Sequence, residues 1–153
     1  MMNTSTHESV RSAPNLELLE SFCRDELAAT QTYEKALTLP ILKRHSAVLN
    51  GCYESHRARA TMLAQRIGAL GGKVPESPGI WGALVPALTG AAAAVSEHLA
   101  ISLLEESEDR GLKHYRAKLD ELESLNRDFI LERVLPAQNS THASLSSLKH
   151  SLE

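Results

Sequence analysis

The sequence predicts an all-α protein: an antiparallel four-helix bundle with a long crossover between its second and third helices. Leu and Ala are abundant, whereas aromatic residues make up only 4% of the 153 residues. This composition favours helices packed on helices over a sheet, whose surface favours aromatic and β-branched side chains. Apolar residues recur at helical spacing in four long segments, and short, long and short connections between them describe two helical hairpins.

The first helix is expected to begin after Pro14, with Asn15 as its cap, and to run to about Leu37. Residues 1–14 are polar and rich in Ser and Thr, so a flexible leader is expected there. The bundle then occupies residues 15–153.

The second helix is expected from Pro40, a residue suited to a first helical turn, to about Leu70. Gly71 and Gly72 are the stop signal. Gly51, inside this helix, either destabilises it locally or marks a place where another backbone comes close.

The second half of the chain begins with the crossover, residues 73–92, whose middle at 81–88 is compatible with a short crossing helix. The third helix is expected over 91–124 and the fourth over 126–152. Pro136 should kink the fourth helix.

Charge and composition exclude several functions. A net charge of −3 gives no general attraction to nucleic acid, and a solvated face explains the basic residues of the second helix, which are Lys43, Arg44, Arg57, Arg59 and Arg66. Cys23 and Cys52 are too few for a disulfide framework or a zinc ribbon. The longest apolar run, residues 79–95, is interrupted and too short to span a bilayer, so no membrane association is expected. A cytoplasmic location is expected.

Each predicted helix interrupts its apolar stripe with Glu or His near the midpoint. The four residues are Glu26, His56, Glu108 and His142. Glu26 lies 14 residues before Pro40, and His56 lies 16 after it. Glu108 and His142 flank Asn126 in a similar way, at 18 residues before it and 16 after it. With a rise of about 1.5 Å per residue, both groups of each hairpin fall within about one turn of each other.

A weak internal repeat supports this alignment. The first helix has Leu19, Glu26 and Tyr33 at intervals of seven residues, and the third has Ile101, Glu108 and Tyr115 at the same intervals. The spacing predicts two pseudo-equivalent halves.

A buried carboxylate is costly unless it is paired, protonated or bound to a metal. Glu and His from facing helices are ligands that bundle proteins use for iron, manganese or zinc. The alternative is a metal-free network in which two protonated histidines balance two glutamates.

The segment Asp25-Glu26-Leu27-Ala28-Ala29-Thr30-Gln31-Thr32-Tyr33 resembles the first helix of bacterioferritins. Further similarities are Leu70-Gly71-Gly72, the run from Glu105 to Arg116, and His142. Over residues 15–150 the chain resembles the ferritin-like superfamily, in particular a small bacterial branch without an assigned function. The resemblance implies a ferritin-like bundle in which Glu26 is a metal ligand.

The sequence departs from that pattern at two bridging positions. A full two-iron site takes a Glu three residues before each His, but Tyr53 precedes His56 and Asn139 precedes His142 at that spacing. Glu105, one turn from Glu108, is a reserve ligand. Two-iron oxidase or ferroxidase activity is therefore not expected, and no catalytic residue is predicted. The residues expected beside the ligands are Tyr33, Tyr53, Tyr115 and Asn139.

Two functions remain open at this point. The first is a metal-binding protein with a reduced Glu/His site for iron or zinc, in metal handling or a stress response. The second is a non-catalytic helical interaction module, a homodimer whose site has decayed and holds no metal. Trp81 and residues 91–94 are candidates for a bundle cover or a dimer contact.

Overall fold

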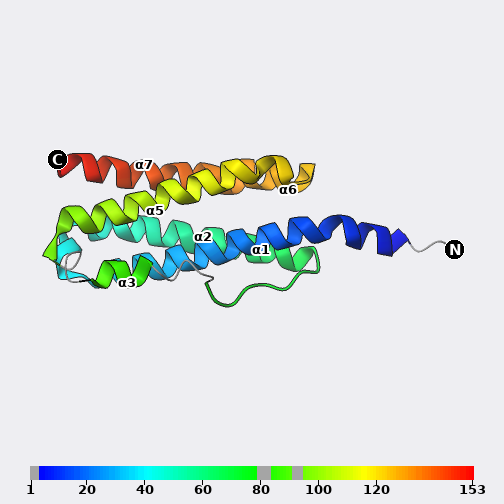
Figure 1. The fold of residues 1–153 in the computed structure, drawn as a ribbon, viewed down its shortest axis with the longest axis horizontal. Helices are drawn as coiled ribbons and strands as arrows, with labels where there is room; N and C mark the ends of the chain where they lie inside the picture. The colour runs from blue at the N-terminus through cyan, green and yellow to red at the C-terminus, as the bar shows by residue number, and fades with distance from the viewer. Residues whose placement is uncertain (1–3, 79–83, 91–94) are drawn as a thin grey trace.

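The computed structural model describes residues 4–78, 84–90 and 95–153, and all secondary structure in these residues is helical, which confirms the all-α prediction. Figure 1 shows long helical segments lying side by side along the molecule. These are α1 (Thr4–Ala36), α2 (Ser46–Ala69), α5 (Glu97–Lys118), and a last segment made of α6 (Ser124–Phe129), η4 (Ile130–Val134) and α7 (Leu135–Ser151). The chain reverses direction between α1 and α2 and again between α5 and α6, whereas α2 and α5 run the same way (Figure 1).

The predicted start of the first helix was wrong. α1 begins at Thr4, so helix covers residues 4–14, where a flexible leader was expected, and Pro14 lies inside it. Asn15 does not cap this helix. It is buried, and its Oδ1 accepts a hydrogen bond from the backbone N–H of Glu123 at 2.9 Å. A partner that lies so far along the chain cannot be read from local cap signals.

The second helix matches its predicted bounds, although its first part is the 3₁₀ helix η1 (Pro40–His45). Gly71 has a φ of 78°, a left-handed conformation that glycine adopts at low cost. The Gly72 N–H then bonds the Ile67 carbonyl at 2.9 Å and closes the end of α2. A Cβ at Gly51 would have no atom within 4 Å, so this glycine makes no close backbone approach.

The crossover contains a short helix, α3 (Leu84–Thr89), at the end of the molecule where α1 turns into α2 (Figure 1). Residues 79–83 and 91–94 lie outside the described residues, and with them the predictions made for Trp81 and for the expected start of the third helix. α5 begins at Glu97, and the Ser96 hydroxyl caps it by accepting the Leu99 N–H at 3.1 Å. It ends at Lys118, before the expected end, and the short 3₁₀ helix η3 (Leu119–Glu121) follows.

A π-helical turn, η4, lies just before Pro136, the residue at which a kink was predicted. Proline has no N–H to donate to the preceding turn, and a wider turn accommodates that loss. Within this turn Ile130 and Val134 are buried, whereas Leu131 is 41% exposed.

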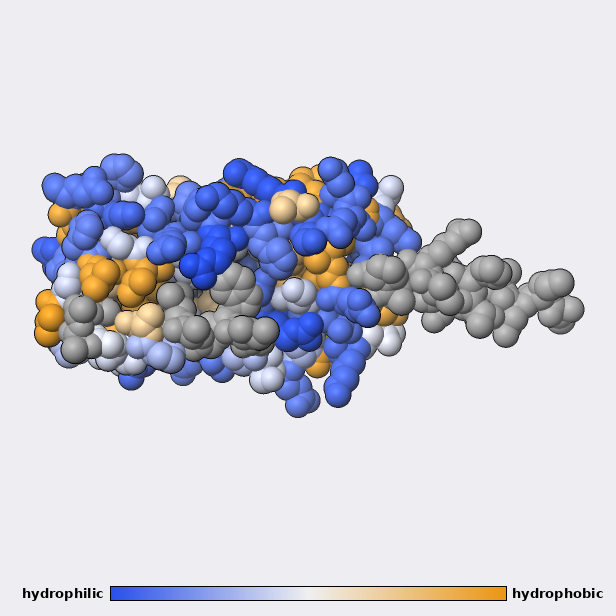
Figure 2. All heavy atoms as spheres, viewed as in Figure 1, coloured by the Kyte–Doolittle hydropathy of each residue, from blue (hydrophilic) through white to orange (hydrophobic). Residues whose placement is uncertain are grey.

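Two apolar clusters fill the interior, and the polar residues of interest lie between them. Cys52 belongs to one cluster, with Tyr33 and Leu49, and Cys23 belongs to the other, with Leu19 and Phe22. Both thiols are free. Figure 2 shows polar side chains over most of one face, with apolar ones gathered at the end that carries α3. No helix among the described residues could cross a membrane.

Candidate functional site

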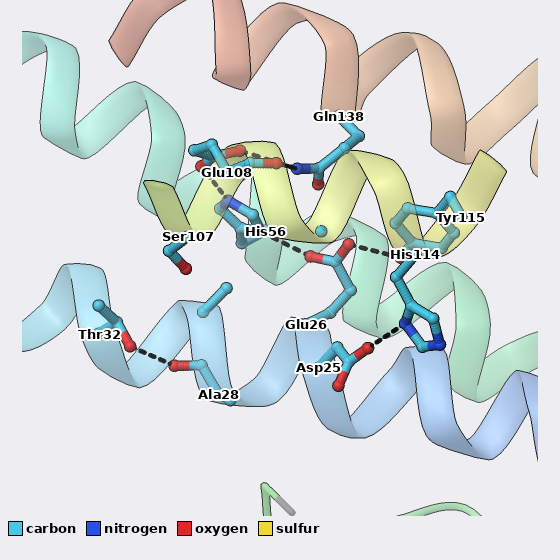
Figure 3. Close-up of a pocket in the computed structure, with 12 residues that line it drawn as sticks. Asp25, Glu26, Ala28, Thr32, His56, Ser107, Glu108, His114, Tyr115 and Gln138 are labelled. Carbon is cyan, nitrogen blue, oxygen red and sulfur yellow. Dashed lines mark hydrogen bonds and ion pairs between the residues drawn. The ribbon is translucent and has the colours of Figure 1, made fainter. Parts of the chain in front are cut away.

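The imidazole of His56, on α2, lies between two buried carboxylates. Its Nδ1 is 2.6 Å from Oε2 of Glu26 on α1, and its Nε2 is 2.6 Å from Oε1 of Glu108 on α5 (Figure 3). All three residues are buried. The structure therefore brings together three of the four predicted polar residues, at one level of the molecule.

Two tyrosines complete this arrangement crosswise. The hydroxyl of Tyr33, on α1, donates to Glu108 on α5 at 2.6 Å, and that of Tyr115, on α5, donates to Glu26 on α1 at 2.6 Å. The internal repeat thus has a structural meaning, because each helix supplies a carboxylate for the tyrosine of the other. The Tyr33 ring also stacks on the His56 ring, with centroids 5.2 Å apart.

The second cation of the network is Arg59, one turn after His56 on α2. Its side chain is 0% exposed, which corrects the prediction that it lies on a solvated face. Its Nη1 lies 3.4 Å from Oε1 of Glu26 and donates to Oε1 of Gln138. Its Nη2 donates to the Thr141 hydroxyl at 3.2 Å, and its Nε donates to the Ser55 carbonyl at 3.3 Å.

Two residues of α7 complete the network, which otherwise consists of residues from α1, α2 and α5. The amide of Gln138 donates to both Oε2 and the backbone carbonyl of Glu108, each at 2.9 Å. The Thr141 hydroxyl donates to the same Oε2 at 2.7 Å. Each Glu108 oxygen therefore has at least two donors, which favours the ionised carboxylate.

The charges of the network balance. Burial alone would raise the pKa of Glu26, but Arg59 and His56 hold it below its usual range. Burial has the same effect on Glu108, whose pKa is lowered mainly by His56. For His56 burial would lower the pKa, yet Glu26 and Glu108 raise it. Two carboxylates thus face one imidazolium and one guanidinium, which is always charged.

The structure places His142 and Glu105 outside this centre. The inward position that was predicted for His142 is taken by its neighbour Thr141, whose side chain is buried. The His142 ring is half-buried, and its Nε2 lies 3.4 Å from Oε1 of Glu105. Glu105 also pairs with Lys149 at 3.4 Å.

The residues predicted beside the ligands divide in the same way. Tyr33 and Tyr115 bond the carboxylates directly. Tyr53 packs instead against the apolar cluster that contains Cys52. Asn139 is exposed and accepts a hydrogen bond from Arg116 at 3.1 Å, so its predicted position was wrong.

A cavity of about 50 Å³ opens between α1 and α5 next to the network (Figure 3). The cavity exists because several of its lining residues are small, namely Ala28, Ala29 and Gly111. Glu26 and His56 also line it. It is lined further by Asp25 and His114, whose Oδ2 and Nδ1 form a hydrogen bond of 2.7 Å. This pair was missed because nothing along the sequence connects its members.

The arrangement at the centre does not fit a metal. Both ring nitrogens of His56 already face carboxylate oxygens at 2.6 Å. A fixed positive charge, Arg59, lies beside Glu26 and would repel a metal cation. Among the described residues, no group of three or more His, Cys, Asp and Glu side chains is arranged to hold a metal ion.

Comparison with known proteins adds no family to this description. No family model matches the chain, and neither a curated protein nor a solved structure matches it.

The approach of α7 to Glu108 depends on a glycine of α5, and this can be tested. A Cβ at Gly111 would lie 3.0 Å from Nε2 of Gln138, the atom that bonds Glu108. Replacing glycine by alanine inside a helix normally stabilises by about 0.5–1 kcal/mol. We expect Gly51→Ala to show that gain, because its new Cβ meets no neighbour within 4 Å. Gly111→Ala should not show it, because Gln138 must move. It should therefore be at least about 1 kcal/mol less stable than Gly51→Ala.

Urea denaturation of the two variants measures this difference. Equal gains would mean that Gln138 shifts freely and that its bonds to Glu108 contribute little.

Proposed function

We propose that this chain is a ferritin-like four-helix bundle without a metal centre, and that it acts as a non-catalytic helical interaction module which associates with a second copy of itself. The observation that carries the proposal is the closed network at its middle. Glu26 and Glu108 have the character of ligands, but His56 and Arg59 supply the positive charge that a metal would bring.

The arrangement of the helices supports the bundle. α1 packs on α2, and α5 packs on α7. The crossover that joins these hairpins runs back along the molecule before α5 begins (Figure 1). A long crossover between hairpins is typical of ferritin-like folds.

A non-catalytic role is supported by the way the network is satisfied. The oxygens of both carboxylates face donors from the chain itself. No substrate group is needed to complete these contacts. For the interaction role, Leu125 on α6 and Leu131 on η4 are large apolar side chains left 75% and 41% exposed.

The test is elemental analysis and sedimentation velocity on protein purified without added metal, and again after incubation with iron and with zinc. We expect no stoichiometric transition metal in any of the three samples, and a sedimenting mass of two chains. Buried polar groups that are already paired with one another give a metal no free ligand.

The matched variants are His56→Ala, inside the network, and His142→Ala, outside it. One equivalent or more of metal in the wild type that is lost in His56→Ala but kept in His142→Ala would overturn the proposal. A monomer at all concentrations would remove the self-association from it.

A further inference from the structure

We infer that the centre of this protein is a cation site whose resident cation is the guanidinium group of its own Arg59. The inference rests on the proposed function and goes beyond it, since it assigns the site a ligand class: planar cations with several N–H donors. It is carried by the surroundings of Arg59 rather than by its charge alone.

Acceptors from three helices surround the guanidinium group. Nη1 faces Glu26 of α1 and Gln138 of α7, Nη2 faces the Thr141 hydroxyl, and Nε faces a carbonyl of α2 itself. Each of its nitrogens therefore has an acceptor. A planar fork of donors matches such a ring of acceptors better than a spherical ion does.

The neighbours are also oriented toward a positive charge at this point. The amide of Gln138 directs its oxygen at Arg59 and its nitrogen at Glu108. Thr141 donates its hydroxyl proton to Glu108 and so presents a lone pair to Arg59. These α7 side chains bridge the second carboxylate and the guanidinium, so both carboxylates are coupled to the same cation.

Removing the side chain of Arg59 would leave two carboxylates facing one imidazolium in a buried space. The resulting net charge of −1 is costly to bury unless a cation replaces the one lost. The cavity between α1 and α5 is lined by Glu26 and Gln138. These two residues are also the partners of Nη1, so the cavity adjoins the position that the guanidinium group would leave.

The experiment is thermal unfolding of Arg59→Ala in low concentrations of guanidinium chloride. Sodium chloride at the same ionic strength controls for screening, and urea, a neutral molecule of the same shape, controls for filling the space. We expect the Tm of Arg59→Ala to rise by about 3–6 °C at a guanidinium concentration ten times the dissociation constant. Urea and sodium chloride should give no such rise, and the wild type should show none with any of the three.

Arg66→Ala is the matched control on the same helix. Arg66 also donates two bonds, at 2.9 and 2.8 Å, but to the neutral amide oxygen of Asn126. No carboxylate is left unpaired there, so guanidinium should not raise its Tm. An equal rise in both arginine variants would overturn the inference.

A second variant keeps the test decisive if Arg59→Ala does not fold. Arg59→Ala combined with Glu26→Gln restores the charge balance, so it should fold and should not respond to guanidinium. If this double variant also fails to fold, or if Arg59→Ala folds and shows no response, the inference fails. Stoichiometric metal in the wild type would instead contradict the proposed function, and the two failures are therefore distinguishable.

Discussion

Glu26→Ala is expected to lower the free energy of unfolding by about 3–5 kcal/mol, the usual cost of removing one partner from a buried ion pair. The carboxylate of Glu26 contacts His56, Arg59 and Tyr115. Without it, two buried positive groups share the single charge of Glu108, and the Tyr115 hydroxyl loses its acceptor. Equilibrium denaturation in urea, followed by circular dichroism, measures the change.

Glu34→Ala provides the control, because Glu34 is an exposed residue of the same helix. A surface substitution of this kind should change stability by no more than about 0.5 kcal/mol. If Glu26→Ala costs no more than Glu34→Ala, the network would not be the stabilising centre of the interior, and the charge balance described above would be wrong.

The fold could be predicted from the sequence where the signals are local. Gly71 ends α2 because the chain there takes a positive φ, and glycine is the residue that permits it. The start of α1 could not be predicted, because Asn15 is of a residue type that commonly caps helices but bonds a backbone group 108 residues away. On α7 the inward position beside Glu108 was assigned to His142, but its neighbour Thr141 occupies it, between the buried residues Gln138 and Leu145. Two adjacent polar residues give no local signal of which one is buried.

Both anions of the candidate site could be predicted from the sequence, but only one of its two cations, His56. Glu26, His56 and Glu108 stand out because they interrupt apolar stripes at one level. Arg59 was overlooked because α2 carries other arginines, and one of them, Arg57, is exposed as expected. The signal that could have identified it is its spacing, three residues after His56, which places both on one face of the helix. Two buried glutamates also require two positive charges, and His142 was assigned the role that Arg59 has.

The charge balance also predicts how stability depends on pH. Glu26 and Glu108 have pKa values lowered from 4.5, so their contribution is complete above pH 4.5 and is lost as the pH falls through their folded values. His56 has a pKa raised from 6.5, so its contribution is complete below pH 6.5 and is lost as the pH rises through its folded value. The free energy of unfolding should therefore be highest between these two limits.

The alkaline side of this profile isolates His56, provided that the pH stays below 9.0, the ordinary pKa of the two buried thiols. Above pH 6.5 the free energy of unfolding should fall with a slope of at most about 1.4 kcal/mol per pH unit, the value for one proton. Urea denaturation at a series of pH values measures the slope. His56→Gln, which cannot titrate, should abolish it, whereas His98→Gln, at an exposed position, should leave it unchanged. A slope that persists in His56→Gln would mean that another group is responsible, and that the imidazole between the two carboxylates is not held in its charged form.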